Sequence, residues 1–255
     1  MKSLSIDRVK AIAAATSTWR GWDLLGVKTR RAPVPWQLTE VIAEYLSGLE
    51  VILDMGCGNG KLLAQLANGF TRGIGVDISK ERIDEARLSL PIMLRTRIHF
   101  TRASSHKVPA PDAAFQVVLN RQAPLFPAEI DRLLAPGGYF ITQQVGPENT
   151  RAIIAAFNEA RWPLPPWPDE MLLPNTFTTL DTLGYRTLRS DEYDVPYVFA
   201  DAESLIYWLQ MVPVPQDFNI ESDAETVLEI LDRLTTPNGI VTNEHRQLLV
   251  MQKPT

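Results

Sequence analysis

The sequence predicts an α/β protein with a doubly wound, mostly parallel sheet and helices on both faces. The first observation is that apolar, β-rich runs alternate with helical patterns through short connections between residues 51 and 146. The second is the run Val51–Asp54, which ends in an acid and is followed by Gly56, Gly58 and Gly60. A strand, a tight turn and a helix start are thereby joined, and in α/β folds ligands bind at such carboxyl ends of strands.

The bulk composition is that of an ordinary globular protein. The chain has 255 residues, of which 45% are hydrophobic and 22% charged, and it shows no repeat, low-complexity tract or clear linker. We therefore expect one domain over residues 1–255. It would comprise a helical cover (1–50), a ligand-binding core (51–146) and a C-terminal part that completes the sheet and carries inserted helices (147–255).

The charge balance bears on partners. A net charge of −5 gives no global attraction to nucleic acid. Arg20, Lys28, Arg30 and Arg31 are close in sequence and could form a local basic patch, although solvated surface charges are the simpler interpretation.

Cysteine content and hydropathy bear on the compartment. Cys57 is the only cysteine, so a disulfide and a Cys-based zinc site are excluded, and no Asp, Glu and His cluster has metal-ligand spacing. No signal-peptide pattern and no apolar run near the roughly 20 residues of a membrane helix is present. We expect a cytoplasmic protein with no metal and no membrane partner, and the oligomeric state stays open.

The remaining elements follow from periodicity and capping residues. Ser79, Asn149 and Asp201 are candidate helix N-caps, 222–225 is a capping box, and Gly69 is expected to close a helix in a left-handed conformation. Apolar spacing predicts helices near 35–46, 61–68, 79–88, 128–135, 149–157, 177–183, 201–209 and 222–234, and strands near 51–54, 72–77, 97–101, 115–120, 139–145, 185–199 and 247–251. The proline-rich stretch 162–168 predicts a stiff extended loop.

The glycine turn suits a particular ligand. Alternate glycines let the backbone approach a bound molecule, and a helix starting near Asn59 or Gly60 would offer free N–H groups and a positive dipole end. Asp54 adds a negative charge beside them, which favours a ligand with both a carboxylate and an ammonium group. Asp77 ends the next strand, where an acid typically binds ribose hydroxyls, and Ile78 offers an apolar face to a base. These groups together describe an amino-acid nucleoside.

A dinucleotide is the alternative ligand. Its fingerprint is G-x-G-x-x-G, whereas this turn has glycines at alternate positions, and no second nucleotide-binding half is evident. The spacing therefore disfavours a dinucleotide.

The same residues resemble the class I S-adenosylmethionine-dependent methyltransferases, in particular the type-11-like members. Residues 51–60 look like their first signature and 73–79 like the second. Residues 108–118 resemble the loop and fourth strand, and 133–140 the entry to the fifth strand. The resemblance implies a seven-stranded sheet whose last strand is antiparallel, a role that 247–251 could fill.

The resemblance also implies S-adenosyl-L-methionine as the cofactor and a set of residues around it. One departure is that Ala103-Ser-Ser-His106 stands where such sequences usually carry an acid before the adenine loop, and a serine is a weaker acceptor than a carboxylate. By position, the methionine part would contact Asp54, Gly56, Cys57, Gly58 and Gly60, the ribose Asp77, the adenine Ile78, Ser104 and Ser105, and the methyl end Asn120.

No catalytic residue stands out from the sequence. Methyl transfer is an in-line displacement, and a base is needed only where the acceptor must lose a proton. Asn120 is a candidate contact, and Arg121 is more typical of a loop-pinning residue. One of Gln143 and Gln144 should point toward the pocket by alternation. Of the histidines, His99 is expected within the sheet, His106 in the adenine loop and His245 as a cap of the last strand, while Cys57 is expected to be a buried hydrophobe.

Three functions remain open at this point. The first is methyl transfer to a small molecule, with the region Trp19–Trp22 and the helix of Trp208 roofing the pocket and Trp36 packed in the core. The second is modification of a ribosomal guanine, which the acidic balance and the absence of N-terminal zinc-binding cysteines disfavour. The third is a cofactor-binding protein that performs no transfer.

Overall fold

The computed structural model describes residues 4–16, 27–157, 168–212 and 217–255. Trp19–Trp22, including Arg20, and the stretch 162–167 lie outside the described residues, so the predictions made for them are not addressed. The chain forms two compact units. We call residues 1–34, 146–166 and 193–245 the helical unit, and residues 35–145, 167–192 and 246–255 the sheet unit.

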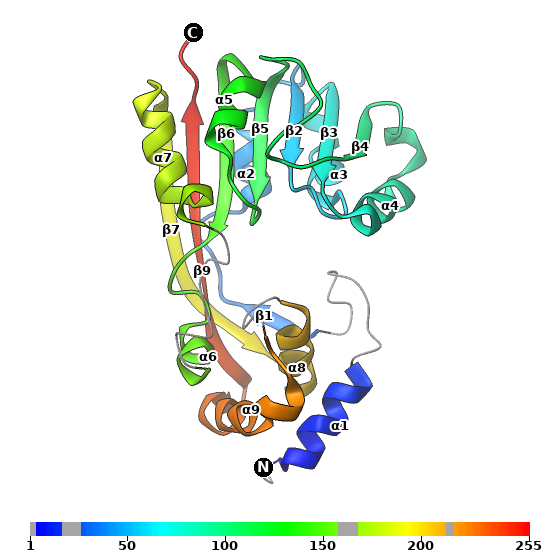
Figure 1. Cartoon of the computed structure of the whole chain (residues 1–255), viewed down its shortest axis with the longest axis vertical. Helices are drawn as coiled ribbons and strands as arrows, with labels where there is room; N and C mark the ends of the chain where they lie inside the picture. Colours follow the sequence, from blue (N-terminus) through cyan, green and yellow to red (C-terminus); the bar gives the residue numbers. More distant parts are fainter. Residues whose placement is uncertain (1–3, 17–26, 158–167, 213–216) are drawn as a thin grey trace. The chain divides into compact units, whose positions relative to one another are not determined.

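Five parallel strands form the centre of the sheet unit, in the order β6-β5-β2-β3-β4, which confirms the predicted α/β class. The arrows of β2, β5 and β6 point the same way in Figure 1. Asp54 and Met55 of β2 lie beside Leu119 and Asn120 of β5, so the carboxyl ends of both strands meet at one edge. The five strands are β2 (Val51–Met55), β3 (Arg72–Asp77), β4 (Ile98–Arg102), β5 (Phe115–Arg121) and β6 (Leu134–Val145).

The predicted count of seven strands is wrong, because the described residues form nine. The additional strands are short: β1 (Thr29–Arg31) pairs antiparallel with β7 (Arg186–Phe199), and β8 (Thr235–Thr236) pairs with β9 (Gly239–Gln252). The predicted last strand is only the end of the 14-residue β9. Its antiparallel pairing with β6 confirms the expected direction. Both β7 and β9 contribute residues to each unit.

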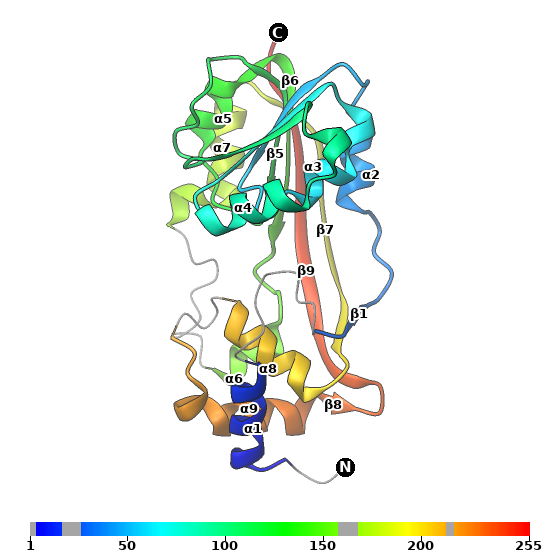
Figure 2. The ribbon, with the colours of Figure 1, turned by 90° about the vertical axis from the view of Figure 1, so that its right-hand side faces the viewer.

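Helices lie on both faces of the sheet in the sheet unit. Figure 2 shows α2 and α3 on one side and α5 and α7 on the other. Side chains of α5 and α7 pack with β2 and β5 in one apolar cluster that includes Leu53, Val118, Ile130 and Leu180. The helices are α2 (Leu38–Ala43), α3 (Lys61–Gln65), α4 (Lys80–Ser89), α5 (Pro127–Leu133) and α7 (Leu173–Thr182), with 3₁₀ turns at Ala67–Gly69, Ile92–Leu94 and Asp169–Met171.

The helical unit has its own core. Val9, Leu205 and Val227 are completely buried in one apolar cluster, against which Trp208 packs at the edge. Arg31 donates to Glu244 at 3.0 Å, so its charge is paired rather than presented as part of a basic patch. The helices of this unit are α1 (Ile6–Thr16), α6 (Arg151–Ala156), α8 (Ala202–Met211) and α9 (Ile220–Leu234).

Two of the predicted helix N-caps are confirmed, and one predicted capping box is wrong. Ser79 accepts a hydrogen bond from the N–H of Arg82, and Asp201 accepts one from Ser204 at 2.8 Å, which confirms both N-caps. The capping box at 222–225 is wrong, because α9 begins one turn earlier and Asn219 caps it.

Three further helix ends differ from expectation. Asn149 does not cap α6, because its side chain accepts from the N–H of His245 and Thr150 takes the N-cap position. The φ angle of Gly69 is not in the left-handed region. Gly69 ends a 3₁₀ turn, and its N–H donates to the carbonyl of Leu66. Pro35 precedes α2 rather than lying in its first turn, since that helix begins at Leu38.

Candidate functional site

The turn after β2 needs its glycines for two independent reasons. Gly56, Gly58 and Gly60 have φ angles of +82°, +53° and +76°, in the left-handed region that side chains disfavour. A Cβ on Gly56 would also lie 2.4 Å from the Cβ of Ala123, and one on Gly60 would lie 2.3 Å from the Phe100 ring. The backbone thus curls against its neighbours with no room for a side chain at these two positions.

Four N–H groups of the turn donate hydrogen bonds within the protein. Gly56 and Cys57 both donate to the carbonyl of Val76 at 2.9 Å, and Gly60 donates to Cys57 at 3.0 Å. Gly58 donates to the carboxylate of Asp77. The expectation of free N–H groups at the helix start is therefore wrong at Gly60, and the N–H groups of the three preceding turn residues are engaged as well. Because α3 has only five residues, its dipole is also short.

Asp77 is held in a fixed position at the end of β3. One carboxylate oxygen accepts from Gly58 and the other from the N–H of Ser79, both at 2.9 Å. Each oxygen keeps further acceptor capacity, which suits a pair of hydroxyl groups. Ile78 beside it is 70% exposed, so an apolar surface adjoins the acid.

Asp54 is a buried acid with an unsatisfied oxygen. Its side chain is 2% exposed and Oδ1 has no hydrogen-bond partner. Burial raises the pKa of Asp54 to about 7, and the nearby charge of Asp77 adds to this while Arg121 opposes it. A cationic group placed beside Asp54 would relieve this cost. The site therefore fits the ammonium group expected from the sequence.

The loop after β4 begins beside Asp77. The N–H of Ala103 donates to the Asp77 carbonyl at 3.1 Å, and Arg102 donates to the carbonyl of Ile78 at 3.0 Å. Ser104 is exposed and its hydroxyl accepts from the N–H of His106, whereas Ser105 is half-buried. Both serines thus follow directly on the segment that is fixed to Asp77 and Ile78.

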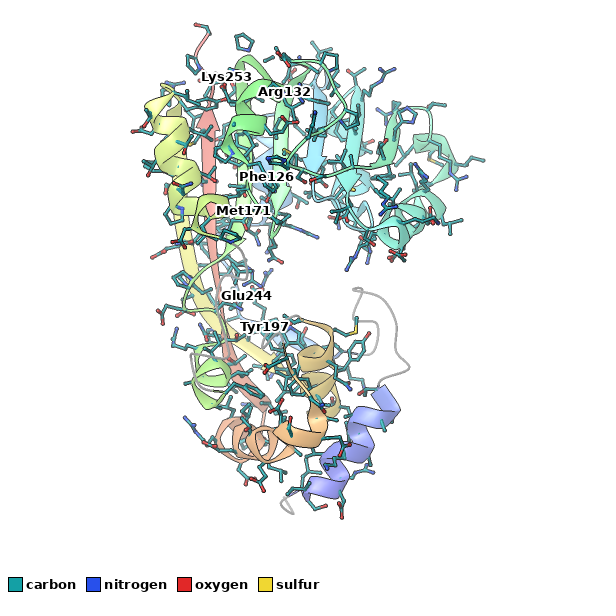
Figure 3. All side chains as sticks on the ribbon, in the orientation of Figure 1. Phe126, Arg132, Met171, Tyr197, Glu244 and Lys253 are labelled. Atoms are coloured by element: carbon teal, nitrogen blue, oxygen red, sulfur yellow. The ribbon has the colours of Figure 1, made fainter. Side chains whose placement is uncertain are left out.

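An acid outside this loop anchors it. Glu129 of α5 accepts from the N–H of Val108 at 2.6 Å and pairs with Arg132 at 2.7 Å. Arg132 also donates to the carbonyls of Val108 and Ala110. Figure 3 labels Arg132 and Phe126 at opposite ends of α5, and the Phe126 ring packs edge-on against His106 with centroids 5.2 Å apart. The loop is therefore fixed at both 106 and 108–110.

Asn120 is buried at the carboxyl end of β5 and supports the neighbouring turns. It donates to the carbonyls of Met55 and Pro124 at 3.1 and 3.2 Å and accepts from Gln144 at 2.7 Å. Both of its amide hydrogens are used within the protein. Its role as a cofactor contact stays a prediction, and the structure gives it a role in holding Met55 in place.

Two arginines near the turn were missed or undervalued by the sequence reasoning. A guanidinium nitrogen of Arg82 would lie 3.5 Å from a Cβ on Gly58, and Arg121 is close enough to lower the pKa of Asp54. The position of Arg82 in the first turn of α4, three residues after the N-cap Ser79, is the signal that could have found it. A helix that starts at the carboxyl edge brings its first turn back to that edge.

The remaining candidates are a cysteine and two histidines. Cys57 is buried, and burial raises the pKa of its thiol, which confirms a packing role over a nucleophilic one. His99 lies within β4 and pairs with Ile74 of β3, which confirms its expected place in the sheet, and its side chain is exposed. His245 does not cap β9; it is buried within that strand and its Nδ1 accepts from the N–H of Glu148. Among the residues that the structure describes, no group of three acids, histidines or cysteines is placed to hold a metal.

Comparison with known proteins identifies the core of the chain. Residues 52–138 match the family model of a methyltransferase domain. The fatty-acid O-methyltransferase of Mycolicibacterium smegmatis is 30% identical over 105 residues, which are 38% of this chain and 37% of that protein. The eEF1A lysine and N-terminal methyltransferase of Mus musculus is 30% identical over 122 residues, covering 41% of this chain and 17% of that protein. The chain thus spans well under half of these two relatives.

Solved structures share the fold over most of the chain. A candidate methyltransferase from Bacillus halodurans C-125 has a TM-score of 0.61 at 17% identity, covering 86% of this chain and 99% of the other. The [4+2]-cyclase SpnF has a TM-score of 0.57 at 17% identity, covering 99% and 98%. At this identity the likeness concerns the fold alone, and it is the Rossmann-like fold of methyltransferases.

The matched domain, the parallel sheet and the Asp54–Gly60 turn agree with one another. Residues 52–138 thus form a methyltransferase domain of the class I, S-adenosylmethionine-dependent kind. In the described segments, no helix is long and apolar enough to cross a membrane.

Proposed function

We propose that the protein binds S-adenosyl-L-methionine and transfers its methyl group to a small-molecule acceptor by in-line displacement. The observation that carries this proposal is the pair of acids at the ends of β2 and β3. Asp54 is buried with an unpartnered oxygen, and Asp77 is fixed by two N–H groups 2.9 Å away. The first suits an ammonium group and the second a pair of ribose hydroxyls.

Each part of the site would have a distinct role in holding the cofactor. Gly56, Gly58 and Gly60 leave the space, Asp54 and Asp77 supply negative charge, and the exposed side chain of Ile78 would cover one face of the adenine. When bound, S-adenosylmethionine supplies a methyl group attached to a positively charged sulfur. An acceptor lone pair forms the new bond as the carbon–sulfur bond breaks, so accurate placement provides much of the acceleration.

Asn120, Ser104 and Ser105 are proposed as further contacts. Asn120 would act mainly by fixing the Met55 carbonyl, because its amide hydrogens are engaged there and at Pro124. Ser104 and Ser105 would accept from the adenine amine, with Glu129 holding their loop through Val108. We assign no general base, since an anionic acceptor would need none.

A small-molecule acceptor is favoured by charge and by relatives. A net charge of −5 weakens binding to RNA through its phosphates. Two relatives are named as O-methyltransferases, the mycobacterial protein and cnsE of Penicillium expansum, which is 32% identical over 103 residues. These names make a hydroxyl or carboxylate acceptor the first to test.

The test is methyl incorporation from S-adenosylmethionine with a radiolabelled methyl group, added with the protein to a cell extract. The extract is then separated into RNA, protein and small-molecule fractions, with Asp77→Ala as the matched control. We expect label in the small-molecule fraction that the control loses. Label in RNA or protein would overturn the acceptor class. Cofactor binding without label in any fraction would instead indicate a binding protein.

A further inference from the structure

The edge of the sheet opposite the glycine turn exposes large apolar side chains. Among the described residues, five such side chains are at least 70% exposed. Ile78 lies at the carboxyl edge, whereas the other four precede parallel strands. Leu49 at 82% lies just before β2, and Leu88, Ile92 and Met93 at 77–81% lie between the end of α4 and the start of β4.

The segment that carries three of these side chains is held in place. Arg95 donates to the carbonyls of Leu90 and Leu88 at 3.1 and 3.5 Å, which closes the chain back onto the end of α4. The N–H of Leu94 donates to Pro91 at 2.9 Å, completing a 3₁₀ turn. Leu88, Ile92 and Met93 therefore protrude from a fixed turn that follows α4.

The same edge is basic. Residues 87–97, which lead into β4, contain Arg87, Arg95 and Arg97 and no acid. Arg72, Arg95 and Arg97 lie at the starts of β3 and β4, and none of them forms an ion pair with a described residue. Arg97 donates to the carbonyl of Phe70 at 3.2 Å, which orients its charge without neutralising it.

The acids near this edge are already engaged. The Glu50 carboxylate accepts from the hydroxyl of Ser47 and from three backbone N–H groups of residues 47–49. Asp84 on α4 pairs with Lys80 at 2.5 Å and lies 3.9 Å from Arg87. Glu50 therefore remains ionised, and the three arginines Arg72, Arg95 and Arg97 outnumber it, leaving a charge of +2 (+3 minus 1) among these four residues.

We propose that this edge docks on the surface of an anionic phospholipid membrane. We call it the amino-edge surface and define it as Leu49, Leu88, Ile92, Met93, Arg72, Arg95 and Arg97. Separate protruding aliphatic side chains can enter the boundary between headgroups and acyl chains, while flanking arginines meet lipid phosphates. RNA would be expected to meet aromatic side chains for base stacking, and the surface contains none.

The proposal revises the expectation of no membrane partner. That expectation rested on the lack of a long apolar run, which a spanning helix needs but a peripheral contact does not. Because β2, β3 and β4 are parallel, the surface lies at the opposite end of these strands from Asp54 and Asp77. Docking and cofactor binding are therefore separable in experiments.

The test is co-sedimentation of the full chain with vesicles of phosphatidylcholine alone or with 30% phosphatidylserine. We expect the partition coefficient to be about tenfold or more higher with phosphatidylserine, and to fall as salt rises. The triple variant L88S/I92S/M93S should lower it about tenfold or more. R72E should weaken it as well, and the Arg72 side chain forms no hydrogen bond with the residues that the structure describes. The matched control is L183S, another exposed apolar residue of the sheet unit.

Cofactor affinity, measured on every variant, reports whether the sheet unit remains folded. Equal binding to both vesicle types, or an equal loss in L183S and the triple variant, would overturn the proposal. It would also be overturned if the triple variant abolished self-association or RNA binding while leaving vesicle binding unchanged. If the triple variant lost cofactor affinity, the outcome for R72E alone would decide.

Discussion

The two ends of β2, β3 and β4 carry opposite chemistry. At the carboxyl end, Asp54 is buried beside the glycine turn, and Asp77 is fixed by the N–H groups of Gly58 and Ser79. At the amino end, the side chains of Leu49, Ile92 and Arg72 are exposed. The same strands join the two ends, so the difference arises from the terminal residues of these strands and from the connecting segments.

This difference separates what each end can bind. The carboxyl end is shaped by backbone geometry and buried charge, which suits a small polar ligand held in one orientation. The amino end has no such enclosure, and its exposed apolar and cationic side chains suit an extended surface. The predictions that follow alter one end and use the other as the control.

The largest effect is expected for Gly60→Ala. An alanine at position 60 would have to adopt a left-handed backbone conformation. Its Cβ would also lie 2.3 Å from the Phe100 ring. We expect a loss of about 2 to 4 kcal/mol in the free energy of unfolding, measured by urea denaturation. Gly48→Ala at the amino end is the control, because Gly48 has φ of +92° but no atom within 4 Å of its Cβ position. It should lose about 1 kcal/mol.

Equal losses in the two glycine variants would mean that backbone strain alone sets the cost. The close packing of the turn against β4 would then contribute nothing to stability.

The second effect concerns pH and Asp54. The folded protein keeps a proton on Asp54 up to pH about 7, whereas the unfolded chain releases it near the ordinary value of 3.8. The free energy of unfolding should therefore fall as pH rises from about 4 to 7 and then level off. The free energy of unfolding is measured by urea denaturation at each pH for wild type and Asp54→Asn. As pH rises from 5 to 8, the value for Asp54→Asn should increase by about 2 to 3 kcal/mol relative to that for wild type.

Glu50 at the amino end is the matched control and should show the opposite sign. Burial raises its pKa, but hydrogen bonds from Ser47 and nearby backbone N–H groups lower it more, so the net pKa is below 4.5. Its contribution is therefore present above pH 4.5 and lost as pH falls below it. Parallel pH profiles for wild type and Asp54→Asn would show that Asp54 is ionised in the unliganded protein.

The sequence predicted what depends on neighbouring residues. The strands from 51 to 145, the caps at Ser79 and Asp201, and the position of Asp77 beside the glycine turn all follow from periodicity and spacing over a few residues. The antiparallel end of β9 was also expected, although only from the family resemblance.

The sequence could not show what depends on distant contacts. Asn149 was expected to cap α6 but bonds to His245, 96 residues away. Five residues of β9 were predicted where the structure has 14, because pairing partners and not local composition set its length. The occupied N–H groups of the glycine turn depend on the Val76 carbonyl of the next strand, and likewise carry no local signal.

The third effect is on cofactor affinity. Asp77→Ala removes the acceptor proposed for the ribose, and we expect the binding free energy of S-adenosylmethionine to weaken by about 1 to 3 kcal/mol. Isothermal titration calorimetry measures it, with Glu50→Gln as the control that leaves affinity unchanged. An unchanged affinity in Asp77→Ala would mean that the ribose is bound elsewhere, and no binding by wild type would refute the cofactor itself.

The smallest effect is expected for Glu129→Gln, which weakens the anchor of the loop after β4. The carboxylate accepts from Val108 and from two nitrogens of Arg132, so its loss should speed hydrogen exchange at the Val108 amide. We expect cofactor binding to weaken by about 0.5 to 1 kcal/mol, because the loop would contact only the adenine. Asp112→Asn is the control, since this exposed acid also pairs with Arg132 and contributes little.

The two measurements on Glu129→Gln separate anchoring from recognition. Faster exchange with unchanged affinity would show that the loop is anchored by Glu129 but does not touch the adenine. Ser104 and Ser105 would then leave the proposed site, and Ile78 would be the remaining adenine contact. Faster exchange with weaker binding would instead mean that Glu129, a buried acid on α5, supports adenine binding by holding the loop backbone in place. An acid within the loop would otherwise contact the adenine directly.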